Sequence, residues 1–333
     1  DFYENYNQAK EFLNLELGLS DFSGGFLITT TAIQNILEAM NEIYIPDFDE
    51  TINKDNFYIK TQLYSEESFF PGSTQKKSFL ASLTRQLFIE LENASFPKLL
   101  TALNKSLDEK QISLIFEDEN IQGTYDSQYW SGKKISPTCY ADLENCTVDY
   151  IFPYDANLGV NKANFFINRH LSLKININNE GTIVNELTML INNESQSAIF
   201  PGGTYKNYMQ IDLPRRAIIR NLTRNGVLIE NFDEKVDDTK TIGFLTEIPP
   251  QKSIEIKLVY ALQNAVTNGE GTYQLIFQKQ IGSKNSDLSI EIKIPNNVTV
   301  QDQNFNPVVK DDTILYNTTL TGDKIFILKL RKN

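Results

Sequence analysis

The sequence is poor in the side chains that most often bind metals or form nucleophile and base pairs. It contains one histidine, His170, and two cysteines, Cys139 and Cys146. A catalytic set of serine or cysteine with histidine would have to use His170, which begins an alternating segment typical of a strand. A zinc site would lack the second cysteine pair that completes four ligands. We therefore expect no cofactor and no common hydrolase site.

Long apolar runs are also missing. The chain has no stretch of about 18 apolar residues and no signal-peptide pattern, which predicts that the residues shown are soluble. It begins at Asp1 without methionine. We therefore expect either a processed product or a trimmed fragment, with a signal or membrane anchor originally upstream.

Composition places the chain among ordinary globular proteins. With 333 residues, 41% of them hydrophobic and 22% charged, it can bury a sizeable core and form two or three domains. Its net charge of −12 argues against nucleic acid and anionic membranes as main partners, because both attract clustered lysine and arginine. Residues 1–60 carry eleven acidic residues against three lysines, which predicts a solvated acidic face or a surface for cations or basic partners.

The two cysteines are close in sequence. Cys139 and Cys146 are separated by six residues in a polar stretch that also contains Pro137. Such a pair indicates a disulfide and hence an oxidising compartment, with two free thiols as the alternative.

Helical periodicity dominates the first part of the chain. Apolar residues at helical spacing predict helices at 31–42, from Ser73 or Thr74 to 93, and at 97–107, the first capped by Thr31 and Gln34. Short apolar runs at 25–28, 112–116 and 148–152 predict strands between them. Together these elements predict an α/β or α+β layer domain over residues 1–164.

The pattern becomes β after residue 165. Alternating segments at 170–177 and 182–191 flank Asn178-Asn179-Glu180-Gly181, which predicts a hairpin. Further strands are predicted at 208–213, 254–262, 273–278, 288–294, 314–316 and 324–330. The expected fold class is therefore α+β, with an antiparallel β-sandwich over residues 165–333, either one or two in series with a subdivision near 265–271.

Several segments resemble one bacterial family. They are the 154–164 stretch (YDANLGVNKAN), the 25–28 strand with its helix, the helix entry at 70–80, and the segments 205–214 (YKNYMQIDLP) and 273–280 (YQLIFQKQ). On these residues the chain is similar to the family called domain of unknown function 4012. The resemblance implies an exported or envelope-associated bacterial protein, usually with an N-terminal membrane anchor and an additional upstream region.

The helical half of that family is distantly similar to the LytR-CpsA-Psr enzymes, which transfer glycopolymers from a polyprenyl-pyrophosphate carrier to the cell wall. That chemistry needs arginines for the pyrophosphate and carboxylates for a divalent metal. The first 165 residues contain one arginine, Arg85. A single arginine is a poor pyrophosphate clamp, so transferase activity is not the favoured interpretation.

Two groups of residues are candidates for binding. Within 154–164 we single out four polar residues, where Gly159 can supply a left-handed turn and the first and last of the four can pair: Asp155, Asn157, Asn161 and Lys162. A purely structural role also explains this loop. The second group is the one basic concentration in the chain, on predicted strand and turn: Arg215, Arg216, Arg220 and Arg224. It either contacts an anionic polymer or another copy, or pairs with the acidic surface of its own chain.

An acidic segment offers a weak metal hypothesis. Asp47, Asp49 and Asp55 carry oxygens suited to Ca²⁺. The segment is not an EF-hand, because Ile52 stands where glycine is required and Lys54 intrudes. A solvated loop leading into a helix at Asp55 is the alternative.

Taken together, the sequence favours a non-catalytic extracellular module of the bacterial envelope with a surface-interaction or structural role. Its expected partner is a cell-wall polymer or another envelope protein, and not nucleic acid. The alternatives are a LytR-CpsA-Psr-like enzyme or binder of polyprenyl-linked glycopolymers, and a ligand-binding subunit of a membrane partner.

Overall fold

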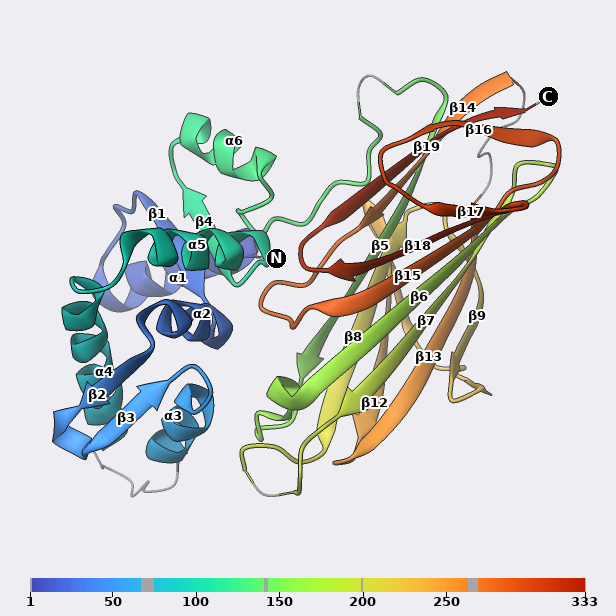
Figure 1. Cartoon of the computed structure of the whole chain (residues 1–333). Coiled ribbons are helices and arrows are strands. Elements are labelled where there is room, and N and C mark those ends of the chain that lie inside the picture. The colour runs from blue at the N-terminus through green and yellow to red at the C-terminus, as the bar shows by residue number, and fades with distance from the viewer. Residues whose placement is uncertain (1, 67–74, 141–142, 199, 263–268, 333) are drawn as a thin grey trace. The chain divides into compact units, whose positions relative to one another are not determined.

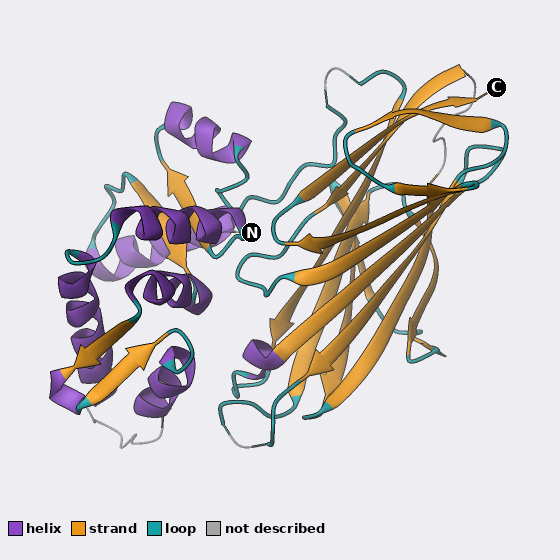
Figure 2. Ribbon diagram, viewed as in Figure 1, coloured by secondary structure: helices purple, strands orange, loops and turns teal. Residues whose placement is uncertain are grey.

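The computed structural model describes residues 2–66, 75–140, 143–198, 200–262 and 269–332. The chain divides into two compact units. The first comprises residues 1–134 with 281–283, and the second comprises 135–280 with 284–333. Figure 1 colours both along the sequence, and Figure 2 shows that helices dominate the first unit and strands the second.

The first unit combines helices with two short antiparallel strand pairs, β1 with β4 and β2 with β3. Its elements are α1 (Phe2–Leu17), β1 (Gly24–Ile28), α2 (Thr30–Met40), β2 (Glu42–Ile45), η1 (Pro46–Phe48), β3 (Glu50–Asn53), α3 (Phe57–Glu66), α4 (Gln75–Leu91), α5 (Phe96–Asp108), β4 (Ile112–Phe116) and α6 (Glu119–Ser127). None of the helices in the described ranges combines the length and apolar character that crossing a bilayer requires.

Its main core forms where α2, α3 and α4 pack on the β2–β3 hairpin. The buried residues of this cluster are Leu37, Ile43, Ile45, Ile52, Phe57, Phe79 and Leu83. Phe79 is fully buried and stacks on Tyr64 with ring centroids 4.3 Å apart. Apolar residues at helical spacing on α2 and at strand spacing on β2 therefore meet in one cluster, as amphipathic elements require.

The predicted helices are present, with changed ends. The helix expected at 31–42 is α2, but its N-cap is Thr29, whose hydroxyl accepts the Ala32 N–H at 3.2 Å. The helix expected at 97–107 is α5. The long helix is α4, and its expected start at Ser73 or Thr74 lies outside the described residues.

The second unit is a sandwich of two large sheets, of eight and seven strands among the described residues. The eight-stranded sheet has the order β10-β9-β13-β7-β6-β15-β18-β17, and the seven-stranded sheet β11-β12-β8-β5-β14-β19-β16. Neighbouring strands are antiparallel except for the pairs β14 with β5 and β15 with β6. The predicted α+β class with an antiparallel sandwich is therefore confirmed, with two parallel pairs that were not expected.

The strands of the sandwich are β5 (Cys146–Asn157), β6 (Ile167–Ile177), β7 (Ile183–Asn193), β8 (Tyr205–Pro214), β9 (Ile218–Arg224), β10 (Val227–Leu228), β11 (Asp233–Val236), β12 (Thr239–Ile248), β13 (Lys252–Leu262), β14 (Gly269–Phe277), β15 (Ser286–Lys293), β16 (Val298–Gln303), β17 (Val308–Lys310), β18 (Thr313–Leu320) and β19 (Lys324–Lys332). A short 3-10 helix, η2 (Ala163–Phe166), leads into β6.

The unit boundary differs from the predicted one at residue 164. The second unit begins at Ile135, and β5 lies in the middle of its seven-stranded sheet, between β8 and β14. The 148–152 run therefore belongs to the sandwich, because β5 pairs with strands more than fifty residues later in the chain. Strands on both sides of 265–271 contribute to one hydrophobic cluster, so the described residues form one sandwich; residues 263–268 lie outside them.

Candidate functional site

The 154–164 loop is held mainly by side chains bonded to backbone. Asn157 Oδ1 accepts the Gly159 N–H at 2.9 Å, and Asn161 Oδ1 accepts the Ala163 N–H at 3.2 Å. The Asn161 amide also donates to the carbonyl of Thr204 at 2.8 Å. The first two contacts are Asx-type turns, and the third ties the loop to the residue before β8. Both asparagines are thus engaged in shaping the loop.

The left-handed residue of this loop is Lys162, with φ 59°, and not Gly159 as predicted. Gly159 is needed for space instead. A Cβ there would lie 2.9 Å from Asn161 Oδ1 and 3.1 Å from Asn157 Oδ1. The predicted pairing of Lys162 with Asp155 is absent from the described residues, where Asp155 has another partner.

Asp155 forms an ion pair with Arg169, and the Tyr205 hydroxyl donates to the same carboxylate at 2.6 Å. The Asp155 and Arg169 side chains are 8% and 16% exposed. Burial alone would lower the pKa of Arg169, but the adjacent Asp155 carboxylate outweighs it and raises the pKa overall. Gln280 Oε1 accepts the Asp155 N–H at 3.1 Å, and the Gln280 amide donates to the Asp155 carbonyl at 2.8 Å. This cluster is satisfied internally, which gives Asp155 a structural role.

The four candidate arginines lie on the turn after β8 and along β9. Arg215 and Arg216 occupy the turn that the Ala217 N–H closes onto the Pro214 carbonyl at 2.8 Å. Arg220 lies where the register between β9 and β13 shifts, and Arg224 ends the strand. A bulge of this kind redirects a side chain.

All four arginine side chains are exposed, and none forms an ion pair with a carboxylate in the described part of the chain. The expected pairing with the acidic face of residues 1–60, which belongs to the other unit, stays a prediction. Arg224 also lines a groove of about 690 Å³ at the β10 and β11 edges of the sandwich. In that groove the Tyr208 hydroxyl donates to Asp233 at 2.7 Å.

The acidic segment 47–56 does not bring its aspartates together. The Ser82 hydroxyl donates to Asp47 at 2.7 Å, and the Tyr44 hydroxyl donates to Asp49 at 2.9 Å. No group of three or more histidine, cysteine, aspartate or glutamate side chains with metal-site spacing occurs among the described residues. Asp55 contributes a backbone N–H to the turn before α3, donated to Asn53 Oδ1 at 3.0 Å.

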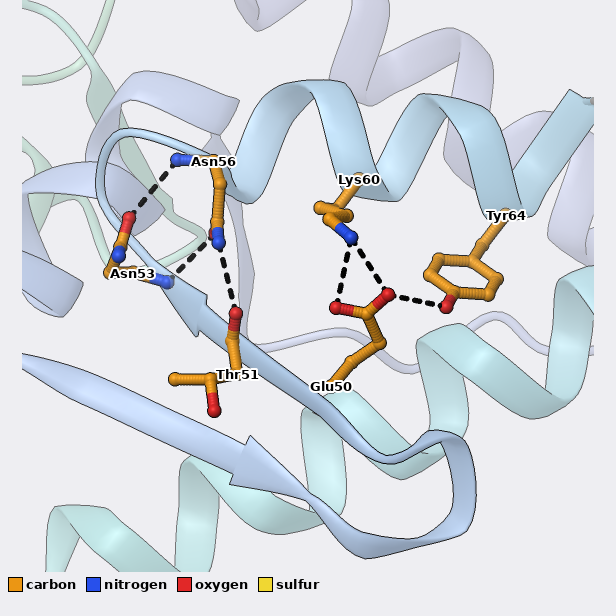
Figure 3. A network of polar contacts seen from close by, with 6 residues as sticks. All are labelled: Glu50, Thr51, Asn53, Asn56, Lys60 and Tyr64. Atoms are coloured by element: carbon orange, nitrogen blue, oxygen red, sulfur yellow. Dashed lines mark hydrogen bonds and ion pairs between the residues drawn. The ribbon is translucent and has the colours of Figure 1, made fainter.

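Figure 3 shows how this segment is used. Lys60 and Tyr64 project from α3 towards the carboxylate of Glu50. The Lys60 ammonium donates to both carboxylate oxygens, at 2.7 and 2.9 Å, and the Tyr64 hydroxyl donates at 2.8 Å. The hydrogen bond from Lys60, followed by that from Tyr64, lowers the pKa of Glu50. Asn53 and Asn56 exchange hydrogen bonds at the helix entry, at 2.9 and 3.1 Å. The segment therefore fastens β3 to α3; most of it is the 3-10 turn η1 and the strand β3 and not the solvated loop that was expected, and the helix begins at Phe57 and not at Asp55.

Cys139 and Cys146 form a disulfide, which confirms the predicted pairing. The bridge joins the first residue of β5 to the segment before it. That segment is also bonded to β14, because Gln274 accepts the Tyr140 N–H at 3.1 Å and donates to the Thr138 carbonyl at 2.9 Å.

One buried charged group was missed by the sequence analysis. Asp149 on β5 is fully buried and accepts hydrogen bonds from Asn185 at 2.7 Å, Tyr260 at 2.9 Å, Tyr273 at 2.6 Å and the Tyr150 N–H at 2.8 Å. Burial raises the pKa of Asp149, although the hydrogen bonds oppose the rise. Its only sequence signal is a polar residue inside an apolar strand.

Comparisons with known proteins add structural neighbours only. No family model matches the sequence, and no curated protein matches it. Similar solved structures include a Legionella pneumophila protein named as a candidate for nutrient binding, with 10% identity and a TM-score of 0.34 over 55% of this chain and 70% of that one. Two further examples are yeast leukotriene A4 hydrolase and an M1 zinc metallopeptidase from Deinococcus radiodurans.

The yeast enzyme has 9% identity and a TM-score of 0.33, over 53% of this chain and 30% of that one. The Deinococcus enzyme has 9% identity and a TM-score of 0.29, over 50% and 42%. The chain thus spans less than half the length of either peptidase. Likenesses this low carry no inference about the function of this chain.

Proposed function

We propose that the chain is a non-catalytic module of the bacterial cell envelope whose sandwich contacts an anionic wall polymer. The contact is made by the four arginines of the β8–β9 region: Arg215, Arg216, Arg220 and Arg224. The observation that carries the proposal is their exposure without an ion-pair partner among the described residues, in a chain whose net charge is −12.

The contrast with the lysines supports this assignment. Several lysines on other strands of the sandwich lie next to carboxylates, such as Lys240 at 2.9 Å from Glu234 and Lys206 at 3.8 Å from Glu247. Guanidinium groups bind phosphate through two parallel hydrogen bonds, which makes unpaired arginines well suited to phosphate-bearing polymers. Such groups placed along one strand and its turn also attract an extended polyanion despite the negative charge elsewhere, because salt screens distant charges.

The disulfide supports an extracellular location for the module. Disulfides persist in oxidising compartments and are rare in the reducing cytosol. The bridge between Cys139 and Cys146 lies in the sandwich unit that carries the arginines.

Co-sedimentation with purified bacterial walls tests the proposal, using walls with and without their attached anionic polymers. We expect the wild-type chain to sediment only with polymer-bearing walls, and a variant with all four arginines changed to alanine to stay in solution. A charge-matched control changes four exposed, ion-paired lysines to alanine: Lys206, Lys235, Lys293 and Lys329. Absence of sedimentation at low salt, or equal loss in both variants, contradicts the proposal.

A further inference from the structure

A second surface of the sandwich has the composition of a ligand site. It is a hollow of about 720 Å³ on the outer face of the eight-stranded sheet. Exposed and buried residues alternate along β6 and β7, so this face is opposite the one that packs in the core. It crosses five neighbouring strands in the order β13, β7, β6, β15 and β18, which Figure 1 shows side by side. We call it the hydroxyl trough.

Strand register explains its shape. Its floor is one row of small polar side chains directly opposite one another across the strands: Thr188, Ser172, Ser289 and Asn317. The next row forms one side, and its members are also directly opposite: Glu255, Leu190, His170, Asp287 and Thr319. Short side chains beside longer ones leave a furrow perpendicular to the strands.

The floor offers unused hydrogen-bonding groups. The side chains of Ser172, Thr188 and Asn317 have no hydrogen-bond partner among the residues that the structure describes. Ser289 makes one long bond, 3.4 Å, to the Leu171 carbonyl. A serine or threonine hydroxyl both donates and accepts, and an asparagine amide does the same. Such a row matches a ligand that carries many hydroxyl groups.

The charged groups that line the trough indicate which class of ligand it can bind. The side of the trough carries the carboxylates of Glu255 and Asp287, the latter 3.1 Å from His170 Nδ1, and no arginine lines the hollow. Carboxylates repel a polyanion, so this surface is unsuited to the polymer assigned to the arginines. Leu190, 39% exposed, and the His170 ring supply apolar contact for the C–H faces of sugar rings.

We propose that the hydroxyl trough binds an uncharged, unbranched glycan chain that lies across the strands. With neighbouring strands about 4.8 Å apart, five strands span about 19 Å, which is long enough for a few sugar rings in a row. This site is separate from the arginine contact and does not depend on it.

The test titrates the whole chain with neutral linear tetrasaccharides, namely chitotetraose, cellotetraose and maltotetraose, by calorimetry and NMR. We expect at least one to bind. Ser172→Phe fills the floor and should abolish binding, whereas Asn176→Phe, on the same face of β6 outside the hollow, should not. A variant that combines Asn317→Ala with Thr319→Ala, which removes polar groups without adding bulk, should weaken binding by about tenfold.

The variant without the four arginines separates the two proposals. It should bind the tetrasaccharide like the wild type while losing the anionic polymer. Absence of binding for all three sugars, or equal binding by the wild type and Ser172→Phe, overturns the trough proposal and leaves the arginine contact untouched.

Discussion

Tyr273 donates its hydroxyl hydrogen to the carboxylate of Asp149 at 2.6 Å, inside the sandwich where both residues are 1% exposed or less. Asp149 lies on β5 of the seven-stranded sheet, and two further donors, Asn185 and Tyr260, come from β7 and β13 of the eight-stranded sheet. One carboxylate therefore joins the two sheets through hydrogen bonds inside the sandwich.

We predict that Asp149→Ala destabilises the chain by about 3 kcal/mol, because three buried side-chain donors lose their acceptor. Asp149→Asn keeps one acceptor oxygen at the same place and should cost less. Urea unfolding measures both. A loss for Asp149→Ala no larger than that of an exposed-site substitution would show that the network adds no stability.

The same residue predicts a pH dependence. Because burial raises the pKa of Asp149 in the folded chain, the folded state holds this proton more tightly than the unfolded state. The stabilising contribution is complete below the unfolded pKa of about 3.9 and is lost as pH rises through the folded pKa. The wild type should therefore lose stability relative to Asp149→Asn between acidic and neutral pH. Parallel unfolding curves of the two proteins across this range would argue against a raised pKa.

Arg169 and Arg220 provide a matched pair of arginines. Arg169→Ala leaves the nearly buried Asp155 carboxylate without its cation and should cost about 3 kcal/mol. Arg220→Ala removes an exposed group without a described partner and should change stability by less than about 0.5 kcal/mol. Chemical denaturation measures the loss of stability in both variants. Equal losses for Arg169→Ala and Arg220→Ala would contradict the prediction.

Reduction of the Cys139–Cys146 disulfide should destabilise the sandwich by about 2 to 3 kcal/mol, the value expected for a short closed loop. The disulfide ties Cys139 to the start of β5, and the backbone groups on either side of Cys139, at Thr138 and Tyr140, are bonded to Gln274. The measurement is the melting temperature with and without a thiol reductant. A variant with both cysteines changed to serine controls for other effects of the reductant, since its melting temperature should not respond.

The turn before α3 gives a prediction for the first unit. Asn56 Oδ1 accepts the Asn53 N–H, and its amide donates to the Thr51 carbonyl at 2.9 Å (Figure 3). Asn56→Ala should therefore cost about 1 kcal/mol, as for the loss of a helix cap. Asn104→Ala, at an exposed position within α5, should cost nothing. Thermal unfolding that ranks the two variants in the opposite order would refute this role.

Features made by residues close in sequence could be predicted. The hairpin between β6 and β7 is one, because Asn178 and Gly181 form its turn and Asn178 Oδ1 accepts the Thr182 N–H at 2.8 Å. The disulfide is another, since its cysteines are seven positions apart. Periodicity over ten residues also identified α5.

Features made by distant residues could not be predicted. The sequence places β5 near the helices, but its partners β8 and β14 begin about fifty and more than a hundred residues later, and these pairings assign it to the sandwich. The row from His170 to Asp287 likewise depends on the parallel register of β6 and β15. A single sequence shows which face of a strand is polar, and not which strand lies beside it.

Fluorescence anisotropy with the purified, labelled polymer measures whether the four unpaired arginines hold an anionic wall polymer. The wild type should bind, more weakly as salt rises, and the variant with alanine at positions 215, 216, 220 and 224 should not. A variant with lysine at the same positions should keep weaker, salt-dependent binding, because an ammonium lacks the paired donors of a guanidinium. Equal affinity of the alanine variant and the wild type would show that the four arginines do not hold the polymer.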